Sequence, residues 1–210
     1  MYQNFKNIEH ELSRVSVLNR KVGSEFIISK KYKDDREWWI LGYLCILLRK
    51  AGVEFPHFAI KKNEKNPPDF ITFDHYRKIF RPIEVSEVIA PCRKRTQEYR
   101  NTKVFRNLQE FEFENIVQIP NPWESLIERL NKKFLKKYGS NSWLVLYHNM
   151  SYSVISSSGY WHHTLLYNAK NWKNNGKVDF SNFEGEKVFV INNNCNSMVE
   201  LFPNFEVVIS

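Results

Sequence analysis

Apolar residues in the first half of the chain recur at the spacing of α-helices. A first amphipathic helix is predicted within residues 1–20, where apolar residues are separated by polar ones at helical spacing: Phe5, Ile8, Leu12 and Val15. A second helix is predicted over residues 34–52, because an aspartate can cap its start and Gly52 can close its end. Apolar residues surround this second helix almost completely, so we expect it to be covered on more than one side.

Short apolar runs predict the extended segments. Residues 23–29 ("GSEFIIS") predict a short strand or an extended connector, and residues 54–60 predict a strand. Residues 69–74 and 78–88 predict two further strands that form a β-hairpin. Because a proline cannot donate to a strand ladder, Pro82 requires a bulge or an unpaired position in the last of these strands.

The second half of the chain predicts a helix that leads into a buried strand. Residues 121–140 have a helical apolar face that ends at Gly139, and residues 142–148 form the continuous apolar run typical of a parallel, fully buried strand. This succession indicates a crossover back onto the sheet. Residues 159–172 predict another helix, and residues 89–121 fit either a basic helix or a surface loop before an extended segment. Three short strands are predicted near the C-terminal end: 187–192, 198–202 and 206–210.

Composition and charge favour a single folded domain with a polyanionic partner. The chain has 210 residues, of which 42% are hydrophobic, enough for a sizeable core. A formal charge of +8 attracts phosphate backbones, which makes nucleic acid the favoured partner class. Three cysteines without CxxC spacing indicate a reducing, cytoplasmic location. The longest apolar run, residues 38–48, is too short to span a bilayer, so no membrane association is expected.

Two carboxylates of the predicted hairpin stand among apolar residues. Asp69 begins one strand and Glu84 lies in the next, so adjacent antiparallel strands can bring their side chains together. Glu37 falls in line with the apolar stripe of the preceding helix. Converging carboxylates repel each other unless a cation lies between them, and Mg²⁺ is commonly held in this way. The sequence therefore predicts a site for Mg²⁺ or Mn²⁺ near Asp69 and Glu84.

The segments "PPDF" and "IEVSE", joined by the hairpin, resemble motifs of the PD-(D/E)XK nuclease superfamily. The resemblance covers about residues 34–148 and implies a restriction endonuclease-like fold. Such a fold is α/β, with a mixed central sheet flanked by helices and an α-β-β-β-α-β core. Residues 1–33 would then be an N-terminal helical appendage and residues 149–210 a C-terminal extension of the same domain.

The resemblance also implies an activity and a set of site residues. The chain would be a Mg²⁺-dependent nuclease that hydrolyses phosphodiester bonds, in DNA rather than RNA. Asp69 and Glu84 would be catalytic acids and metal ligands, and Glu37 a further metal ligand from the first core helix. Restriction-type members often dimerise, so a homodimer is among the expected assemblies.

The chain departs from the superfamily pattern at Ser86, where the motif lysine should stand two residues after Glu84. A serine cannot supply the positive charge of that lysine. Some members carry the lysine on the following core helix, and helical periodicity places Lys133 and Lys137 at the edge of the apolar face of residues 121–140. We choose Lys133, with Lys137 second. Without such a lysine, the chain would be an inactive relative that binds nucleic acid or a protein partner, for example in defence, toxin neutralisation or regulation.

Each acid also has a simpler explanation. Asp69 fits a cap or turn residue at the start of a strand, and Glu84 fits an ion pair with Arg81 or Arg93. Lys133 fits a solvated helix residue. These explanations make no use of a metal, so the geometry of the three side chains decides between the two interpretations.

The adjacent histidines His162 and His163 suggest a third hypothesis, an enzyme with an unrelated site. Neighbouring side chains on a helix or strand point in different directions, and no spaced acid partner is evident. Packing near Trp161 is therefore the favoured role.

Overall fold

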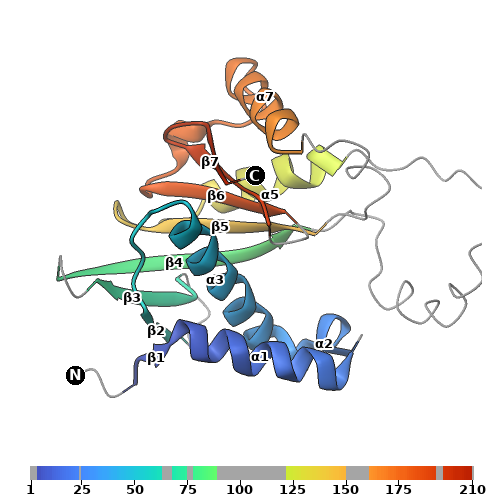
Figure 1. Cartoon of the computed structure of the whole chain (residues 1–210). Coiled ribbons are helices and arrows are strands. Elements are labelled where there is room, and N and C mark those ends of the chain that lie inside the picture. The colour runs from blue at the N-terminus through green and yellow to red at the C-terminus, as the bar shows by residue number, and fades with distance from the viewer. Residues whose placement is uncertain are drawn as a thin grey trace, which may run out of the picture.

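A mixed β-sheet forms the middle layer of the protein, with helices on both faces (Figure 1). The computed structural model describes residues 4–23, 25–62, 68–74, 78–88, 122–149, 161–192 and 196–209. Within them the sheet has eight strands: β1 (Lys6–Asn7), β2 (Phe58–Lys61), β3 (Phe70–Asp74), β4 (Ile79–Val88), β5 (Trp143–His148), β6 (Lys187–Asn192), β7 (Met198–Phe202) and β8 (Glu206–Ile209). The predicted α/β class with a mixed sheet is confirmed.

The strands lie in the sheet in the same order as in the chain. Strands β1 to β4 are antiparallel neighbours, β4, β5 and β6 run parallel, and β6 to β8 are again antiparallel. Helix α5 (Pro122–Phe134) precedes β5, and α7 (Trp161–Asn174) precedes β6, so each parallel connection contains a helix. The predicted crossover into residues 142–148 and the later strands are confirmed.

Three helices lie on the side of the sheet opposite to α5 and α7: α1 (Ile8–Val22), α2 (Glu25–Ile28) and α3 (Lys33–Lys50) (Figure 1). Two 3-10 turns, η1 (Lys30–Tyr32) and η3 (Phe180–Asn182), complete the described elements. The side chain of Asn7 accepts a hydrogen bond from the amide of His10 (3.0 Å), which starts α1 there. Phe5 therefore precedes the helix, and the strand or connector predicted for residues 23–29 is wrong, because α2 is helical.

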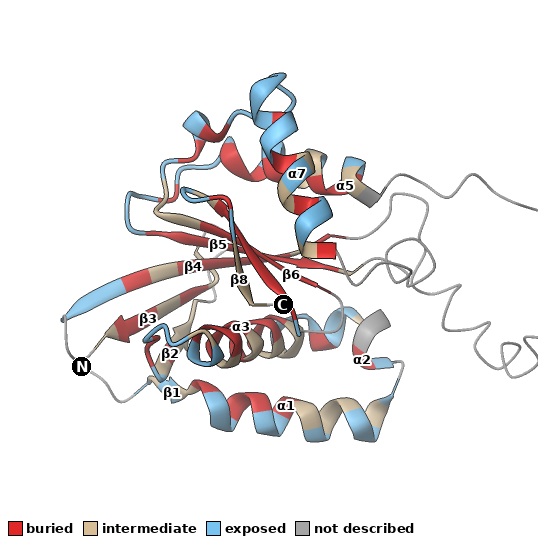
Figure 2. Cartoon of the chain, turned by 45° about the horizontal axis from the view of Figure 1, so that its top comes forward, coloured by how far each residue is buried: buried red, intermediate tan, exposed pale blue. Residues whose placement is uncertain are grey.

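Two hydrophobic cores form, one on each face of the sheet. Along β5, Trp143, Val145 and Tyr147 face α3, while Leu144 and Leu146 face α5 and α7. All six residues of β5 are buried, as predicted for a strand with parallel neighbours and helices on both sides (Figure 2).

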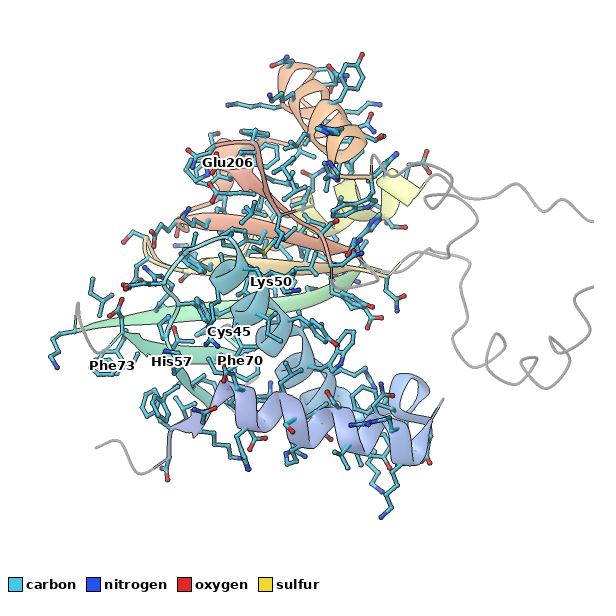
Figure 3. All side chains as sticks on the ribbon, in the orientation of Figure 1. Cys45, Lys50, His57, Phe70, Phe73 and Glu206 are labelled. Atoms are coloured by element: carbon cyan, nitrogen blue, oxygen red, sulfur yellow. The ribbon has the colours of Figure 1, made fainter. Side chains whose placement is uncertain are left out.

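Helix α3 lies between the sheet and α1 (Figure 2). The two helices approach closely at Gly42, where an added Cβ would lie 2.7 Å from the Cβ of Leu12. The opposite side of α3 packs on the sheet in a core that includes Cys45 and Phe70, both labelled in Figure 3. The prediction that α3 is covered on more than one side is confirmed.

The β3–β4 hairpin is confirmed, with a regular register from Phe70↔Ile83 to Asp74↔Ile79. Pro82 pairs opposite Ile71 without a bulge. Pairing of β4 with β5 begins only at Ile83, so the missing N–H of Pro82 falls where no β5 residue faces it. The unpaired position, not the bulge, accommodates the proline.

None of the described helices is long and apolar enough to cross a membrane.

Candidate active site

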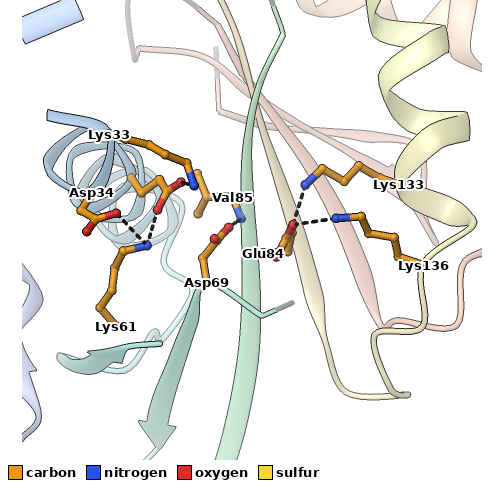
Figure 4. Close-up of polar contacts among 9 residues, drawn as sticks. Lys33, Asp34, Lys61, Asp69, Glu84, Val85, Lys133 and Lys136 are labelled. Atoms are coloured by element: carbon orange, nitrogen blue, oxygen red, sulfur yellow. Dashed lines mark hydrogen bonds and ion pairs between the residues drawn. The ribbon is translucent and has the colours of Figure 1, made fainter. Parts of the chain in front are cut away.

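Asp69 lies at the point where β3 begins and its carboxylate turns toward β4 (Figure 4). Its Oδ2 accepts a hydrogen bond from the backbone amide of Val85 (2.9 Å). The last backbone pair of the hairpin is Phe70↔Ile83, so the Val85 amide lies beyond the end of β3. The aspartate side chain supplies the acceptor that the strand no longer provides. The simple interpretation of Asp69 as a cap is thus part of its role, and none of the described residues donates a hydrogen bond to its Oδ1.

Glu84 projects from the middle of β4 toward α5 and is only 5% exposed. Lys133 donates to its Oε1 at 2.5 Å and is itself 8% exposed, and the Lys136 ammonium lies 3.9 Å from the same oxygen. Helical periodicity therefore located Lys133 correctly at a buried edge of α5. Lys137, the second choice, is exposed.

Of the two arginines predicted as partners of Glu84, the structure describes only Arg81. Arg81 lies against Trp143 in the layer that faces α3, so the proposed Arg81–Glu84 ion pair is wrong. The reason is strand alternation, which points residues three apart in β4 to opposite faces. Arg93 lies outside the described residues. Ser86 is buried and, two residues beyond Glu84 on the same strand, shares its face.

Electrostatics link Asp69 to Glu84. Burial raises the pKa of Asp69, and repulsion from Glu84 raises it further, while the Val85 hydrogen bond, Lys61 and Lys133 oppose the increase. Among the described residues, no cation lies within ion-pairing distance of Asp69. Asp69 is consequently a carboxylate that a bound cation would stabilise.

Glu37 lies near the start of α3 and is buried. Its partners Lys33 and Lys61 lie on the side of Asp69 away from Lys133 (Figure 4). Glu37 forms ion pairs with Lys61 and with Lys33, whose ammonium lies 3.2 Å from Oε1. Attraction to Glu37 raises the pKa of Lys33, with a smaller contribution from Asp69. The structure thus brings Asp69, Glu84 and Lys133 together, whereas Glu37 is occupied by its own lysines. In the described part of the chain, no group of three or more His, Cys, Asp and Glu side chains is arranged to hold a metal ion.

Tyr138 belongs to this neighbourhood and was missed by the sequence reasoning. It follows α5, which ends at Phe134 instead of continuing to Gly139 as predicted. The Tyr138 hydroxyl is buried and has no hydrogen-bond partner among the described residues. Burial raises its pKa, and the charges of Glu84 and Asp69 raise it further. Its apolar spacing with the α5 core concealed this role, because a tyrosine in such a stripe normally only packs.

Other reactive side chains are separate from these acids. His162 and His163 lie on α7 with ring centroids 4.2 Å apart, and partial burial followed by repulsion from His163 lowers the pKa of His162. The buried thiol of Cys45 is free, and desolvation raises its pKa to about 11. A protonated thiol in the core is a packing group and not a nucleophile.

Comparison of the chain with protein-family models, curated proteins and solved structures finds no match. The function is therefore inferred from the site itself.

Proposed function

We propose that this protein is a Mg²⁺-dependent nuclease that hydrolyses phosphodiester bonds in DNA. The observation that carries the proposal is the convergence of Asp69, Glu84 and the buried Lys133 from three separate elements. The order α3, β2, β3, β4, α5, β5 is also the α-β-β-β-α-β order that the resemblance to the PD-(D/E)XK superfamily implies, which supports the same function.

The donor set suits Mg²⁺, which is usually bound by one or two carboxylates together with water and substrate phosphate. Among the described residues, Val85 donates to Asp69 Oδ2 and Lys133 to Glu84 Oε1, which leaves Asp69 Oδ1 and Glu84 Oε2 for a metal. When bound there, Mg²⁺ would lower the pKa of a water molecule and offset the charge on the phosphate. Glu37 would join the site only after releasing Lys33 or Lys61, so we assign the primary ligation to the other two acids.

The lysines define the side from which the substrate approaches. Lys133 holds a positive charge beside Glu84 where the motif lysine is absent, and Lys136 lies near the same oxygen while remaining partly exposed. Exposed lysines of α5 and the turn after it extend this basic surface toward solvent: Lys132, Lys136 and Lys137. Such a surface attracts the phosphate backbone, and Lys133 would stabilise the charge that develops on the scissile phosphate.

Cleavage of supercoiled plasmid in Mg²⁺ or Mn²⁺ tests the proposal. The wild-type protein should nick the plasmid, and both Asp69→Asn and Glu84→Gln should reduce nicking to the level without protein, since each removes a charged ligand while preserving side-chain shape. Glu128→Ala, an exposed acid on α5, is the matched control and should cleave normally. If both site variants cut as fast as the wild type, the proposed active site is wrong.

One observation favours a second function, a nuclease-like fold that binds nucleic acid or protein without cleaving it. Glu84 and Glu37 both form ion pairs with lysines, and Ser86 stands where the motif lysine is expected. Calorimetry separates the two functions. Heat of Mg²⁺ or Mn²⁺ binding that disappears in Asp69→Asn supports the nuclease, whereas salt-sensitive DNA binding without any metal heat supports the binding protein.

A further inference from the structure

A cleft of about 720 Å³ lies on the α3 side of the sheet, on the face opposite to Glu84. The end of α3, the beginnings of β5 and β6, and β8 line this open cleft. Its walls include Leu48, Trp143, Phe189 and Val208. A volume of this size is typical of pockets for small molecules.

Arg81 is the unusual group in this cleft. Its side chain is 9% exposed, and its guanidinium carbon lies 4.3 Å from the centroid of the Trp143 ring. Its Nε lies 3.6 Å from Oε2 of Glu186, too far for a hydrogen bond, and no described residue accepts a hydrogen bond from this nitrogen. This buried nitrogen has lost its hydration without gaining an acceptor, which is unfavourable, although the guanidinium still forms an ion pair with Glu186. A ligand with an anionic group would supply the missing acceptor.

The charges around the cleft restrict the ligand class. Four glutamates and two cations line it: Glu54, Glu186, Glu200, Glu206, Arg81 and Lys187. Lys187 donates to Glu200 at 2.6 Å, so these two neutralise each other. Glu54 and Glu206 are exposed, and Figure 3 labels Glu206 on β8. This acidic surplus repels nucleotides and other polyanions, and it favours a molecule that carries a cationic group beside its single carboxylate.

We propose that this cleft binds a small zwitterion of the free amino acid class, with the ligand carboxylate on Arg81 and the ligand ammonium toward Glu54 and Glu206. Stacking on Trp143 fixes the plane of the Arg81 guanidinium, which favours two parallel N–H···O bonds to a carboxylate. The apolar walls from Leu48 and Val208 receive the remainder of the ligand.

Thermal unfolding with a panel of the standard L-amino acids tests this site, because a ligand that binds only the folded protein raises Tm. At least one amino acid should raise the Tm of the wild type, and its decarboxylated amine should not. Arg81→Met, which keeps an unbranched apolar side chain of similar length, should bind the same amino acid about 10- to 100-fold more weakly in calorimetry. Arg81→Lys keeps the positive charge but lacks the paired N–H donors of a guanidinium, so its affinity should lie between those of the wild type and Arg81→Met.

Two comparisons make the result decisive. Arg20→Met removes an exposed arginine of α1 and should bind like the wild type. Glu84→Gln, on the other face of β4, should still show the rise in Tm with the amino acid. The test of this site is therefore independent of the proposed cleavage activity. If no amino acid raises the wild-type Tm, or if Arg81→Met responds equally, the proposed zwitterion site is wrong. Arg81→Met should remain folded, since it removes a charge that has no hydrogen bond at Nε.

Discussion

Lysine-paired carboxylates flank Asp69 on both sides, but the two pairs lie in different surroundings. On the α3 side, Glu37 pairs with Lys61 and with Lys33, whose side chain is 69% exposed. On the α5 side, Glu84 pairs with Lys133, whose side chain is only 10% exposed. The Lys33–Glu37 and Lys133–Glu84 pairs therefore have unequal consequences, because solvent screens the first pair and not the second, whereas Lys61, with a side chain 13% exposed, is nearly as shielded as Lys133. Asp69, between them, feels both sets of charges and pairs with neither.

Removal of Lys133 should have the largest effect. Lys133→Ala leaves Glu84 buried beside only the more distant Lys136, so we expect a loss of about 3–5 kcal/mol in the free energy of unfolding. Urea denaturation would measure it. The double variant Lys133→Met with Glu84→Leu should recover most of this loss, since it removes both charges. A single variant as stable as the wild type would show that Glu84 is hydrated and not buried.

Tyr138→Phe should affect stability and cleavage in opposite directions. Removing a buried hydroxyl without a hydrogen-bond partner should stabilise the metal-free protein by about 1 kcal/mol. If the hydroxyl donates to the substrate during cleavage, the nicking rate falls while metal affinity in calorimetry is unchanged. An unchanged nicking rate would restrict Tyr138 to packing.

Asp69→Asn should stabilise the metal-free protein by about 0.5–1 kcal/mol at neutral pH, because it removes a buried charge and its repulsion from Glu84 while an amide oxygen can still accept from Val85. The sign follows from the raised pKa of Asp69. The folded protein holds this proton more tightly than the unfolded chain, so stability decreases as pH rises through the folded pKa.

Thermal unfolding as a function of pH measures this difference. The gain in stability of Asp69→Asn over the wild type should be small near the ordinary Asp pKa of about 4 and should increase toward neutral pH. Addition of Mg²⁺ should raise the Tm of the wild type and reduce the advantage of Asp69→Asn. An advantage that is the same at every pH would contradict the electrostatic explanation.

Lys33→Ala should have the smallest effect, about 0.3–0.5 kcal/mol, since its pair with Glu37 is an exposed i,i+4 interaction and Lys61 remains. Added salt should remove most of the difference in the free energy of unfolding between Lys33→Ala and the wild type. A loss comparable to that of Lys133→Ala would mean that the exposed Lys33–Glu37 pair is as strong as the buried Lys133–Glu84 pair.

Local patterns predicted the regular elements that carry their own periodicity. Helix α3, the β3–β4 hairpin and the buried strand β5 follow from spacing of apolar residues within each segment. Errors occurred where neighbours override propensity: the apolar run at α2 resembles a strand, and α5 ends before its apolar stripe does. The basic segment at residues 89–121 lies outside the described residues, and the proposed dimer stays a prediction.

The candidate site shows the same division more sharply. The residues of the chain dictate that acids stand in the hairpin and that Lys133 borders the apolar face of its helix, since strand and helix periods are local properties. Folding alone decides that Lys133 meets Glu84 across 49 residues and that Glu37 is held by Lys61. It also decides that Arg81 points to the opposite face with Trp143. Ion pairing between distant segments depends on which strands become neighbours and on how far each charge is removed from water, and neither quantity is written in the spacing of one segment.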